Sequence, residues 1–400
     1  MRQMENMSRI AGERAAPRMP GISLSAILSQ SRFRLIPMIV VLIVVWLVLE
    51  VLTDGLFISA RNMTNLSGQV AITAVLASAA VMVMVTGNID LSLGATVAAS
   101  AVVAAFASNT YGLGFWPSVV VTIGFGILIG LWHALWVAWL KVPSFIVTLA
   151  SLLGIRGVAL VITNAETIPP SMDMLVISDY ALPPLASAVL LLALWGGFAL
   201  LQWREWQAQR LAGVEASFGV AVALPAVSTG LLTLGAIVVA ASYRGLPLPM
   251  AIVLGVVAVI GGVLRHTGFG RRLYAIGGNR QAAVLAGIDI RRHVTLVFAA
   301  MGAIYGLAGL MLVARLASAP PTAGQGLELN VIAAAVIGGT SLMGGRGLVS
   351  GAVIGALLME SLANGMSLMN LPSSYQSIAV GLVLLVAVYI DVRGRGGQDA

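Results

Sequence analysis

The chain has 400 residues, of which 59% are hydrophobic and only 9% are charged. Soluble domains carry charge on about a quarter of their residues, so this composition argues against a secreted enzyme or a disordered scaffold and predicts a polytopic membrane protein. The formal net charge of +7 would suggest nucleic-acid binding in a soluble chain, but here the basic residues lie between hydrophobic runs, a pattern typical of membrane orientation, and we expect no nucleic-acid partner.

The chain begins with an arginine-rich segment, residues 1–34, which holds six arginines and no apolar stretch. A signal peptide has an apolar core followed by a small-residue cleavage site, and this segment does not fit that pattern. We predict a solvated, partly disordered cytoplasmic tail here and a short second cytoplasmic tail at residues 392–400.

Between these tails, residues 35–391 are expected to form one transmembrane domain in the lipid bilayer. A helix that crosses the hydrocarbon layer needs about 20 apolar residues, and lipid offers no partner for an unpaired strand edge. The predicted fold class is therefore all-α, a polytopic helical bundle of about twelve spans. The predicted spans are 36–52, 66–86, 91–107, 115–139, 144–163, 185–202, 222–241, 248–264, 294–313, 329–343, 348–366 and 375–390.

The basic residues predict how these spans are oriented. With both termini in the cytoplasm and the spans alternating, eighteen basic residues fall inside and three outside, while Arg156 stays within a span. Positive charge favours the cytoplasmic side. Both termini and the loop 265–293 are therefore predicted to be cytoplasmic, and residues 164–184, which carry no basic residue, are predicted to be periplasmic.

Two abrupt connections, residues 86–91 and 341–347, join apolar runs with only a few residues and resemble each other. The segments VTGNIDLSLG (85–94) and VIGGTSLMGG (336–345) are identical at four of ten positions without a gap. Internal repeats are common in transporters, whose substrate path lies near the repeat interface. We predict a structural repeat, and the residues leave open whether the two connections are re-entrant turns or true loops.

The loop 265–293 is the longest polar interruption in the hydrophobic part of the chain, and one short amphipathic helix is expected within it. Its asparagine is suited to cap the helix, and its glycine supplies a left-handed stop. Two interpretations stay open: a charge cluster that only orients the chain, or a docking helix for a cytoplasmic partner. The candidate docking residues are Asn279, Arg280, Ala282, Ala283, Ala286 and Gly287, with the three alanines as the small face that inserts into the partner.

Motifs of nucleotide, metal and catalytic sites are missing from the sequence. The only lysine, Lys141, has no upstream glycine pair, which excludes a GxxxxGK[ST] phosphate loop. The histidines His133, His266 and His293 are far apart without a carboxylate at ligand spacing, and there is no cysteine, so we expect no metal site. We predict no catalytic residue and no cofactor in this chain, and energy for transport has to come from a partner or an ion gradient.

Three segments carry a family resemblance: FGRRLYAIGGNRQAAVLAGI (269–288), TGNIDLSLGA (86–95) and VIGGTSLMGGRG (336–347). Together they resemble the membrane permease subunit of monosaccharide ABC importers, and the resemblance covers nearly the whole chain after residue 36. The segment SLANGMSLMNLPSSYQ (361–376) is similar to the xylose-transporting subgroup of that family.

The resemblance implies import of a monosaccharide, D-xylose or a similar pentose, across the bacterial inner membrane. It implies a homodimer of this permease and a cytoplasmic ATP-binding-cassette ATPase that docks on the loop 265–293 and hydrolyses the ATP. A periplasmic sugar-binding protein would deliver the sugar. Residues 185–241 resemble a two-span insert in a ten-span core.

An ion-coupled secondary transporter for a small polar solute is the alternative function. Such carriers place ionisable residues within the membrane, and the few candidates here are Asp90, Arg156 and Glu360, which disfavours this alternative. A neutral sugar needs only amides, hydroxyls and aromatics in its path, each worth about 1 kcal/mol net. The candidate path residues are Gln69, Asn88, Asp90, Glu360 and Asn364, the last two on one helix face, and a structural hydrogen bond between helices is the competing interpretation of each.

Overall fold

A computed structural model of the chain describes residues 35–213, 217–242 and 245–396. The predicted tail 1–34 lies outside these residues, as do the last four residues of the predicted tail 392–400. Helices make up 79% of the residues that the structure describes. The strands in the described part have two residues each, β1 (Ala181–Leu182) and β2 (Leu246–Pro247). The prediction of an all-α polytopic bundle is confirmed.

Each of the twelve predicted spans lies wholly or largely on a helix. Nine helices in the described residues are long and apolar enough to cross a membrane, and three more apolar helices are shorter. Helices α5 and α6 each continue for one π-helical turn, Phe106–Thr110 and Leu135–Trp139. The helices are α3 (Leu35–Leu52), α4 (Ala60–Val85), α5 (Leu93–Ala105), α6 (Phe115–Ala134), α7 (Ser144–Ile162), α8 (Val176–Asp179), α9 (Pro184–Leu211), α10 (Leu224–Ser242), α11 (Leu248–His266), α12 (Gly268–Gly278), α13 (Arg280–Leu285), α14 (Ile290–Leu316), α15 (Leu327–Ile337), α16 (Val349–Leu368) and α17 (Ser373–Gly396).

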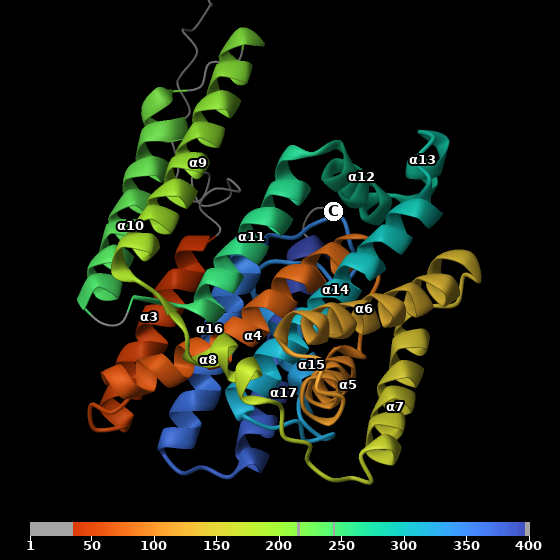
Figure 1. The fold of residues 1–400 in the computed structure, drawn as a ribbon. Helices are drawn as coiled ribbons and strands as arrows, with labels where there is room; N and C mark the ends of the chain where they lie inside the picture. Colours follow the sequence, from red (N-terminus) through yellow and green to blue (C-terminus); the bar gives the residue numbers. More distant parts are fainter. Residues whose placement is uncertain (1–34, 214–216, 243–244, 397–400) are drawn as a thin grey trace, which may run out of the picture.

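Helix α4 is the centre of the bundle. In its apolar part 89% of the residues are buried, and it packs against α11, α14, α15 and α16. Its sequence alternates alanines with branched residues, as in AITAVLASAAV from Ala71. Small side chains let helices approach closely in lipid, where packing rather than hydrophobic burial drives association. The bundle is therefore arranged around a helix that shows little surface to lipid (Figure 1).

Glycines bring α6 and α14 into backbone contact. A Cβ atom added at Gly126 would lie 2.2 Å from the carbonyl oxygen of Gly302, and one added at Gly130 would lie 2.1 Å from that of Phe298. Real Cβ atoms do not approach carbonyl oxygens so closely, so any side chain at these two positions would push the helices apart. This crossing fixes α6 relative to α14. Both helices contribute to the polar cluster around Asp90 that is described below.

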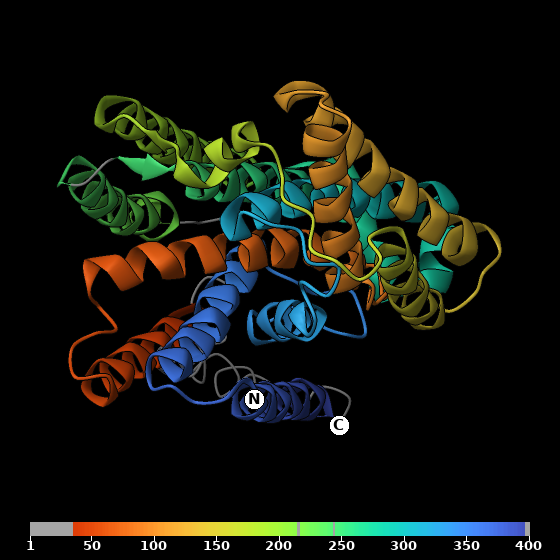
Figure 2. The ribbon, with the colours of Figure 1, turned by 60° about the horizontal axis from the view of Figure 1, so that its bottom comes forward.

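Helices α9 and α10 form a hairpin that packs chiefly on itself and stands beside the rest of the bundle in both views (Figures 1 and 2). At its base β1 and β2 pair antiparallel, with Ala181 opposite Pro247 and Leu182 opposite Leu246. The chain therefore leaves and re-enters the core at neighbouring points. That residues 185–241 are a two-span insert stays a prediction.

Helix α15 corrects the predicted span 329–343. The helix has 11 residues and ends at Ile337, so it is about 16 Å long, roughly half of the hydrocarbon layer. It ends because Gly338 and Gly339 follow, and Gly339 takes a left-handed φ of +82°. The remaining residues, 338–348, form an irregular turn. Short, broken helices of this kind are typical of transporters.

Candidate functional site

The two predicted connections meet each other and the loop 265–293 at four glycines. We call this group, Gly87, Gly277, Gly344 and Gly345, the glycine junction. The amide of Gly345 donates to the Val85 carbonyl at 2.9 Å, which ties the turn after α15 to the end of α4. A Cβ atom at Gly277 would lie 1.8 Å from the Val85 oxygen and 2.6 Å from the Gly345 nitrogen, so three backbones touch here with no room for a side chain.

The two turns are partly buried by protein, whereas Gly87, Met343 and Arg346 are exposed. Thr86, Asn88 and Asp90 are buried in the first turn, and Thr340 and Ser341 in the second. The first turn is also fixed to the start of α7, as described below. Both connections are therefore sharp turns, each with a buried polar part and an exposed part, on the side of the bundle that carries α12.

The sequence predicted one short helix in 265–293, but two helices lie there, and the prediction missed α12. Thr267 caps α12 by accepting a hydrogen bond from the Gly270 amide at 3.1 Å, and Leu273 and Ile276 bury its apolar face. The Tyr274 hydroxyl donates to the Gly347 carbonyl at 2.8 Å. Burial raises the pKa of Tyr274, so the phenol stays protonated and keeps donating.

Helix α13 follows the predicted local signals. The Asn279 side chain accepts a hydrogen bond from the Ala282 amide at 2.9 Å, which satisfies one free donor of the first turn. Gly287 ends the segment with φ +76°, and its amide donates to the Val284 carbonyl at 2.9 Å. The helix itself runs over Arg280–Leu285.

The exposed face of α13 differs from the predicted one. Ala283 is only 3% exposed, so it is packed within its own chain and does not share an open face with Ala282 and Ala286, which are exposed. The structure instead exposes Val284 by 57% and Leu285 by 89%. Val284 and Leu285 thus present two adjacent apolar side chains on the surface of α13.

Asp90 connects three helices around the turn after α4. One carboxylate oxygen accepts hydrogen bonds from the backbone amide and the hydroxyl of Ser92, at 2.8 and 2.7 Å, and the other accepts from the Tyr305 hydroxyl. His133 Nδ1 lies 3.8 Å from the second oxygen. Asp90 is 4% exposed, so it holds the start of α5 against α6 and α14. No group of three metal-ligand side chains occurs in the described part of the chain.

The first turn is also pinned to α7. The Ile89 amide donates to the Ser144 hydroxyl at 3.0 Å, and the Leu91 amide donates to the Thr148 hydroxyl at 3.0 Å. These bonds satisfy two backbone donors that have no helical partner. Asn88, between Gly87 and Ile89, is buried, and its amide nitrogen donates to the Thr86 hydroxyl at 2.8 Å.

A second polar group lies between α4 and α16. Thr73 donates to the Glu360 carboxyl at 2.6 Å, and Asn62 donates to the Asn364 side-chain oxygen at 2.8 Å. Gln69 lies four residues before Thr73 and seven after Asn62, so all three share one face of α4. The Gln69 side chain is half-buried and has no hydrogen bond to any residue in the described ranges.

The five candidate path residues therefore do not form one site. Asn88 and Asp90 lie at the end of α4 near α12, whereas Gln69, Glu360 and Asn364 lie toward its other end. Gln69 and Val85 are 16 residues apart on α4, which corresponds to about 24 Å along the axis. The structure brings each group together and separates the two groups by about half of the length of α4 or more.

Sequence reasoning missed the partners in both groups. Asn62 and Thr73 carried a usable signal, because their helical spacing to Gln69 places three polar side chains on one face. His133 and Tyr305 carried none, because they are distant in sequence from Asp90 and only the packing of α6 and α14 brings them to it.

Comparison with known proteins identifies relatives over most of the chain. The family model described as "Branched-chain amino acid transport system / permease component" matches residues 62–388. The xylose transport system permease protein XylH of Escherichia coli K12 is 43% identical over 362 residues, which cover 88% of this chain and 90% of that protein. No solved structure matches the chain.

Two further relatives differ in their named sugar. The xylose transport system permease protein XylH of Haemophilus influenzae is 42% identical over 366 residues, 90% of this chain and 96% of that protein. The ribose import permease protein RbsC of the same organism is 34% identical over 335 residues, 84% of this chain and 86% of that protein. Similarity is therefore higher to the two xylose permeases than to this ribose permease.

Proposed function

The chain belongs to the family of branched-chain amino acid transport system permease components, and from this premise we propose that it is the membrane subunit of an ATP-binding-cassette importer for xylose. The observation that carries the proposal is the 43% identity to a xylose permease over 88% of the chain, against 34% to a ribose permease. The chain is a multi-pass protein of the bacterial inner membrane.

The proposed partners are a cytoplasmic ATP-binding-cassette ATPase, a periplasmic sugar-binding protein and a second copy of this permease. The ATPase supplies the energy, because this chain has no phosphate loop of its own. The ion-coupled alternative is not favoured, since Asp90 is held by three hydrogen bonds and its carboxylate serves to fix the start of α5.

The glycine junction supports a coupling route for this proposal. A partner that docks on α13 moves the short segment α12–α13, and α12 touches the turns after α4 and α15 backbone to backbone. Packed interfaces of this kind shift between discrete arrangements rather than deform continuously. A movement at the docking surface is therefore passed to both turns, and through Asp90 to α5, α6 and α14.

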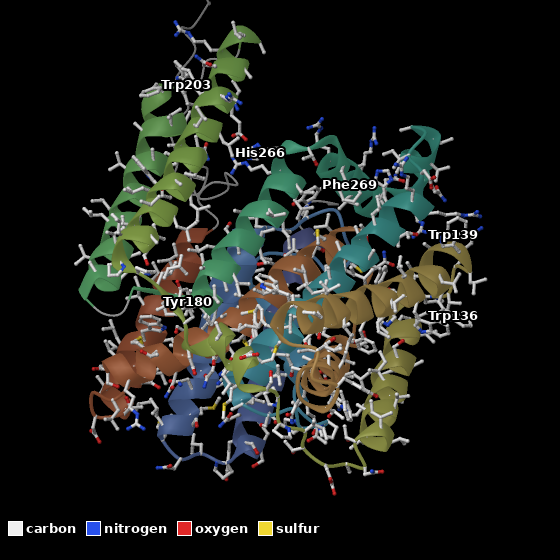
Figure 3. The ribbon with its side chains drawn as sticks, viewed as in Figure 1. Trp136, Trp139, Tyr180, Trp203, His266 and Phe269 are labelled. Atoms are coloured by element: carbon white, nitrogen blue, oxygen red, sulfur yellow. The ribbon has the colours of Figure 1, made fainter. Side chains whose placement is uncertain are left out.

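We propose that the domain 35–391 crosses the bilayer twelve times, with α15 covering about half of one crossing. Both termini and the segment 265–293 then lie in the cytoplasm, and residues 164–184 lie in the periplasm. The eighteen-to-three distribution of basic residues supports this orientation. In Figure 3, Trp203 and His266 lie toward the end of the bundle that carries α12 and α13, where a tryptophan suits a membrane interface on either side of the bilayer.

Single cysteines test the orientation without background labelling, because the chain has none. Asp173 and Gln281 are both exposed. Asp173→Cys should react with an impermeant maleimide in intact spheroplasts, and Gln281→Cys should react only after permeabilisation. Labelling of Gln281→Cys from outside would contradict the orientation.

The group between α4 and α16 is proposed as part of the sugar path, with Gln69 as its free hydrogen-bonding group. Gln69→Ala should slow xylose uptake by about fivefold, the equivalent of one hydrogen bond of about 1 kcal/mol, without lowering thermal stability. Asn364→Ala should instead destabilise the fold by about 1–3 kcal/mol, because it leaves an Asn62 donor unpaired. Wild-type uptake by Gln69→Ala would remove Gln69 from the path.

Reconstitution in liposomes tests the function itself. Xylose should accumulate only when the permease is combined with its ATPase, ATP and the sugar-binding protein. A proton or sodium gradient across liposomes that hold the permease alone should produce no uptake. Accumulation driven by a gradient alone would overturn the ATP-driven importer and favour a secondary carrier.

A further inference from the structure

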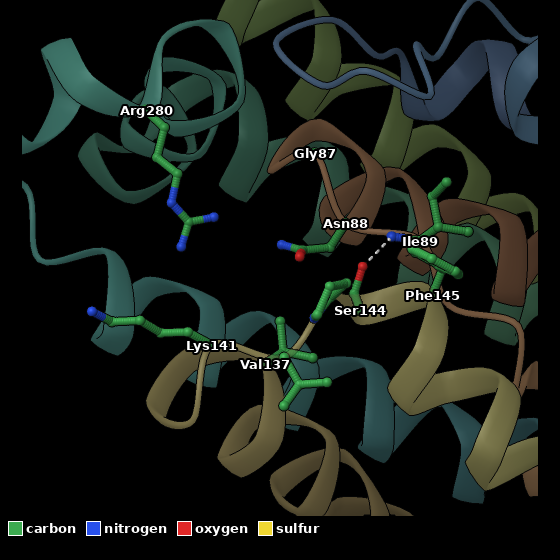
Figure 4. A pocket seen from close by; sticks show the side chains of 10 residues that line it. Gly87, Asn88, Ile89, Val137, Lys141, Ser144, Phe145 and Arg280 are labelled. Atoms are coloured by element: carbon green, nitrogen blue, oxygen red, sulfur yellow. Dashed lines mark hydrogen bonds between the residues drawn. The ribbon is translucent and has the colours of Figure 1, made fainter.

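A pocket of about 440 Å³ opens where the turn after α4, the connection between α6 and α7, and helix α13 come together. Figure 4 shows the Arg280 guanidinium reaching from α13 toward the side chains of Asn88 and Lys141. The lining residues are Gly87, Asn88, Ile89, Val137, Lys141, Val142, Pro143, Ser144, Phe145 and Arg280. Segments that are far apart in the sequence thus converge on one hollow.

The lining of this pocket is positively charged without compensation. Lys141 and Arg280 come from different elements, and none of the lining residues is acidic. The pocket also includes the first turn of the 19-residue helix α7, which begins after Pro143 without a side-chain cap, and free amides at a helix start favour an anion. Ser144 accepts from the Ile89 amide, which leaves its hydroxyl hydrogen free to donate.

We propose that this pocket binds a phosphate group. A guanidinium offers two parallel donors that match two phosphate oxygens, and an ammonium adds a point charge. The amide of Asn88, the hydroxyl of Ser144 and the start of α7 complete a set of donors around one anion. This phosphate belongs either to the headgroup of an anionic lipid or to a free phosphate or phosphate ester of the cytosol.

The position of the pocket gives the bound phosphate a consequence for coupling. Arg280 lies on the proposed docking helix, whereas Asn88 and Ser144 belong to the turn after α4 and to α7. A phosphate held among them connects α13 to the turn that also contacts the glycine junction. Occupancy of the pocket therefore stiffens the link between the docking surface and the bundle.

Lipid retention tests one source of the phosphate. The full-length permease is purified into nanodiscs that contain equal amounts of phosphatidylglycerol and phosphatidylcholine, and bound lipid is measured by native mass spectrometry. Lys141→Gln and Arg280→Gln should each reduce retained phosphatidylglycerol by roughly tenfold, in line with the loss of a charge-assisted hydrogen bond. Arg271→Gln is the control, because Arg271 is exposed in the same segment and does not line the pocket.

Inorganic phosphate tests the other source. In nanodiscs of phosphatidylcholine alone, phosphate should raise the unfolding temperature of the wild type relative to chloride at equal ionic strength, and both pocket variants should lose this shift. Either response identifies a phosphate site and names its source. The proposal is overturned if neither response depends on Lys141 and Arg280 more than on Arg271. It is also overturned if the two variants change only the binding of the ATPase, because the pocket then receives an acidic side chain of that partner.

Discussion

Gly277→Ala should abolish xylose transport while the permease still inserts into the membrane. The added methyl group would lie 1.8 Å from the Val85 carbonyl oxygen and 2.6 Å from the Gly345 nitrogen. Neither is a flexible side chain, so α12 has to move away from both turns, at a cost of about 1–3 kcal/mol or more. Uptake and sugar-stimulated ATP hydrolysis, measured in reconstituted complexes, should both fall to background, because the docked ATPase no longer moves the bundle.

The neighbouring glycine provides a matched control. A Cβ atom at Gly278 meets nothing within 4 Å, and the same substitution there keeps the helix, the loop and the added volume constant. Gly278→Ala should therefore transport at nearly the wild-type rate. If Gly277→Ala and Gly278→Ala transport equally well, the contact of α12 with the two turns plays no part in coupling.

Leu285→Asp should prevent the ATPase from binding. Leu285 is 89% exposed on a helix that stands clear of the apolar spans, and a charge there would have to be buried without a partner in any docked complex. Truncation of a central apolar contact costs about 2 kcal/mol or more, roughly a thirtyfold loss of affinity, and an unpaired charge adds to this. Co-purification of the ATPase with the tagged permease, followed by quantitative immunoblotting, measures the loss.

Gln281→Asp is the control for charge, because Gln281 is an exposed polar residue of the same helix. It should retain most of the ATPase, since charges at a polar rim affect the association rate more than the affinity. Ala283 offers no such test, because it is buried in its own chain and a bulky side chain there would disrupt α13 itself. Full ATPase binding by Leu285→Asp would return 265–293 to the role of an orienting charge cluster.

The long spans were predictable because hydropathy depends on composition alone, and lipid forces every apolar run of sufficient length to be helical. The end of helix α15 was not predictable, because its apolar run continues to Leu342 while the backbone already turns at Gly338. Glycine is common within membrane helices, so the sequence does not distinguish a glycine that ends a helix from one that packs it.

In the candidate site, too, some features follow from neighbouring residues in the sequence, and others depend on contacts between distant segments. The cap at Asn279 and the stop at Gly287 depend on residues within one turn, and both occur as predicted. The burial of Ala283 depends on where α13 lies against the rest of the chain, which no pattern within 265–293 contains. The Asp90 cluster likewise requires the crossing of α6 and α14 to bring His133 and Tyr305 to one carboxylate.

The seam formed by β1 and β2 has a consequence for the ancestry of the permease. Leu182 and Leu246 lie opposite each other in the antiparallel pair. The two helices between them could therefore be added or removed together without stretching the backbone on either side. Two added crossings return the chain to the side of the membrane from which it left, so every later segment stays on the same side of the membrane as before. In the proposed topology, a single additional crossing would have inverted α13 and placed the proposed docking helix in the periplasm, which holds no ATP. In the proposed topology, only the addition of helices in pairs keeps α13 on the cytoplasmic side, where the proposed ATPase is.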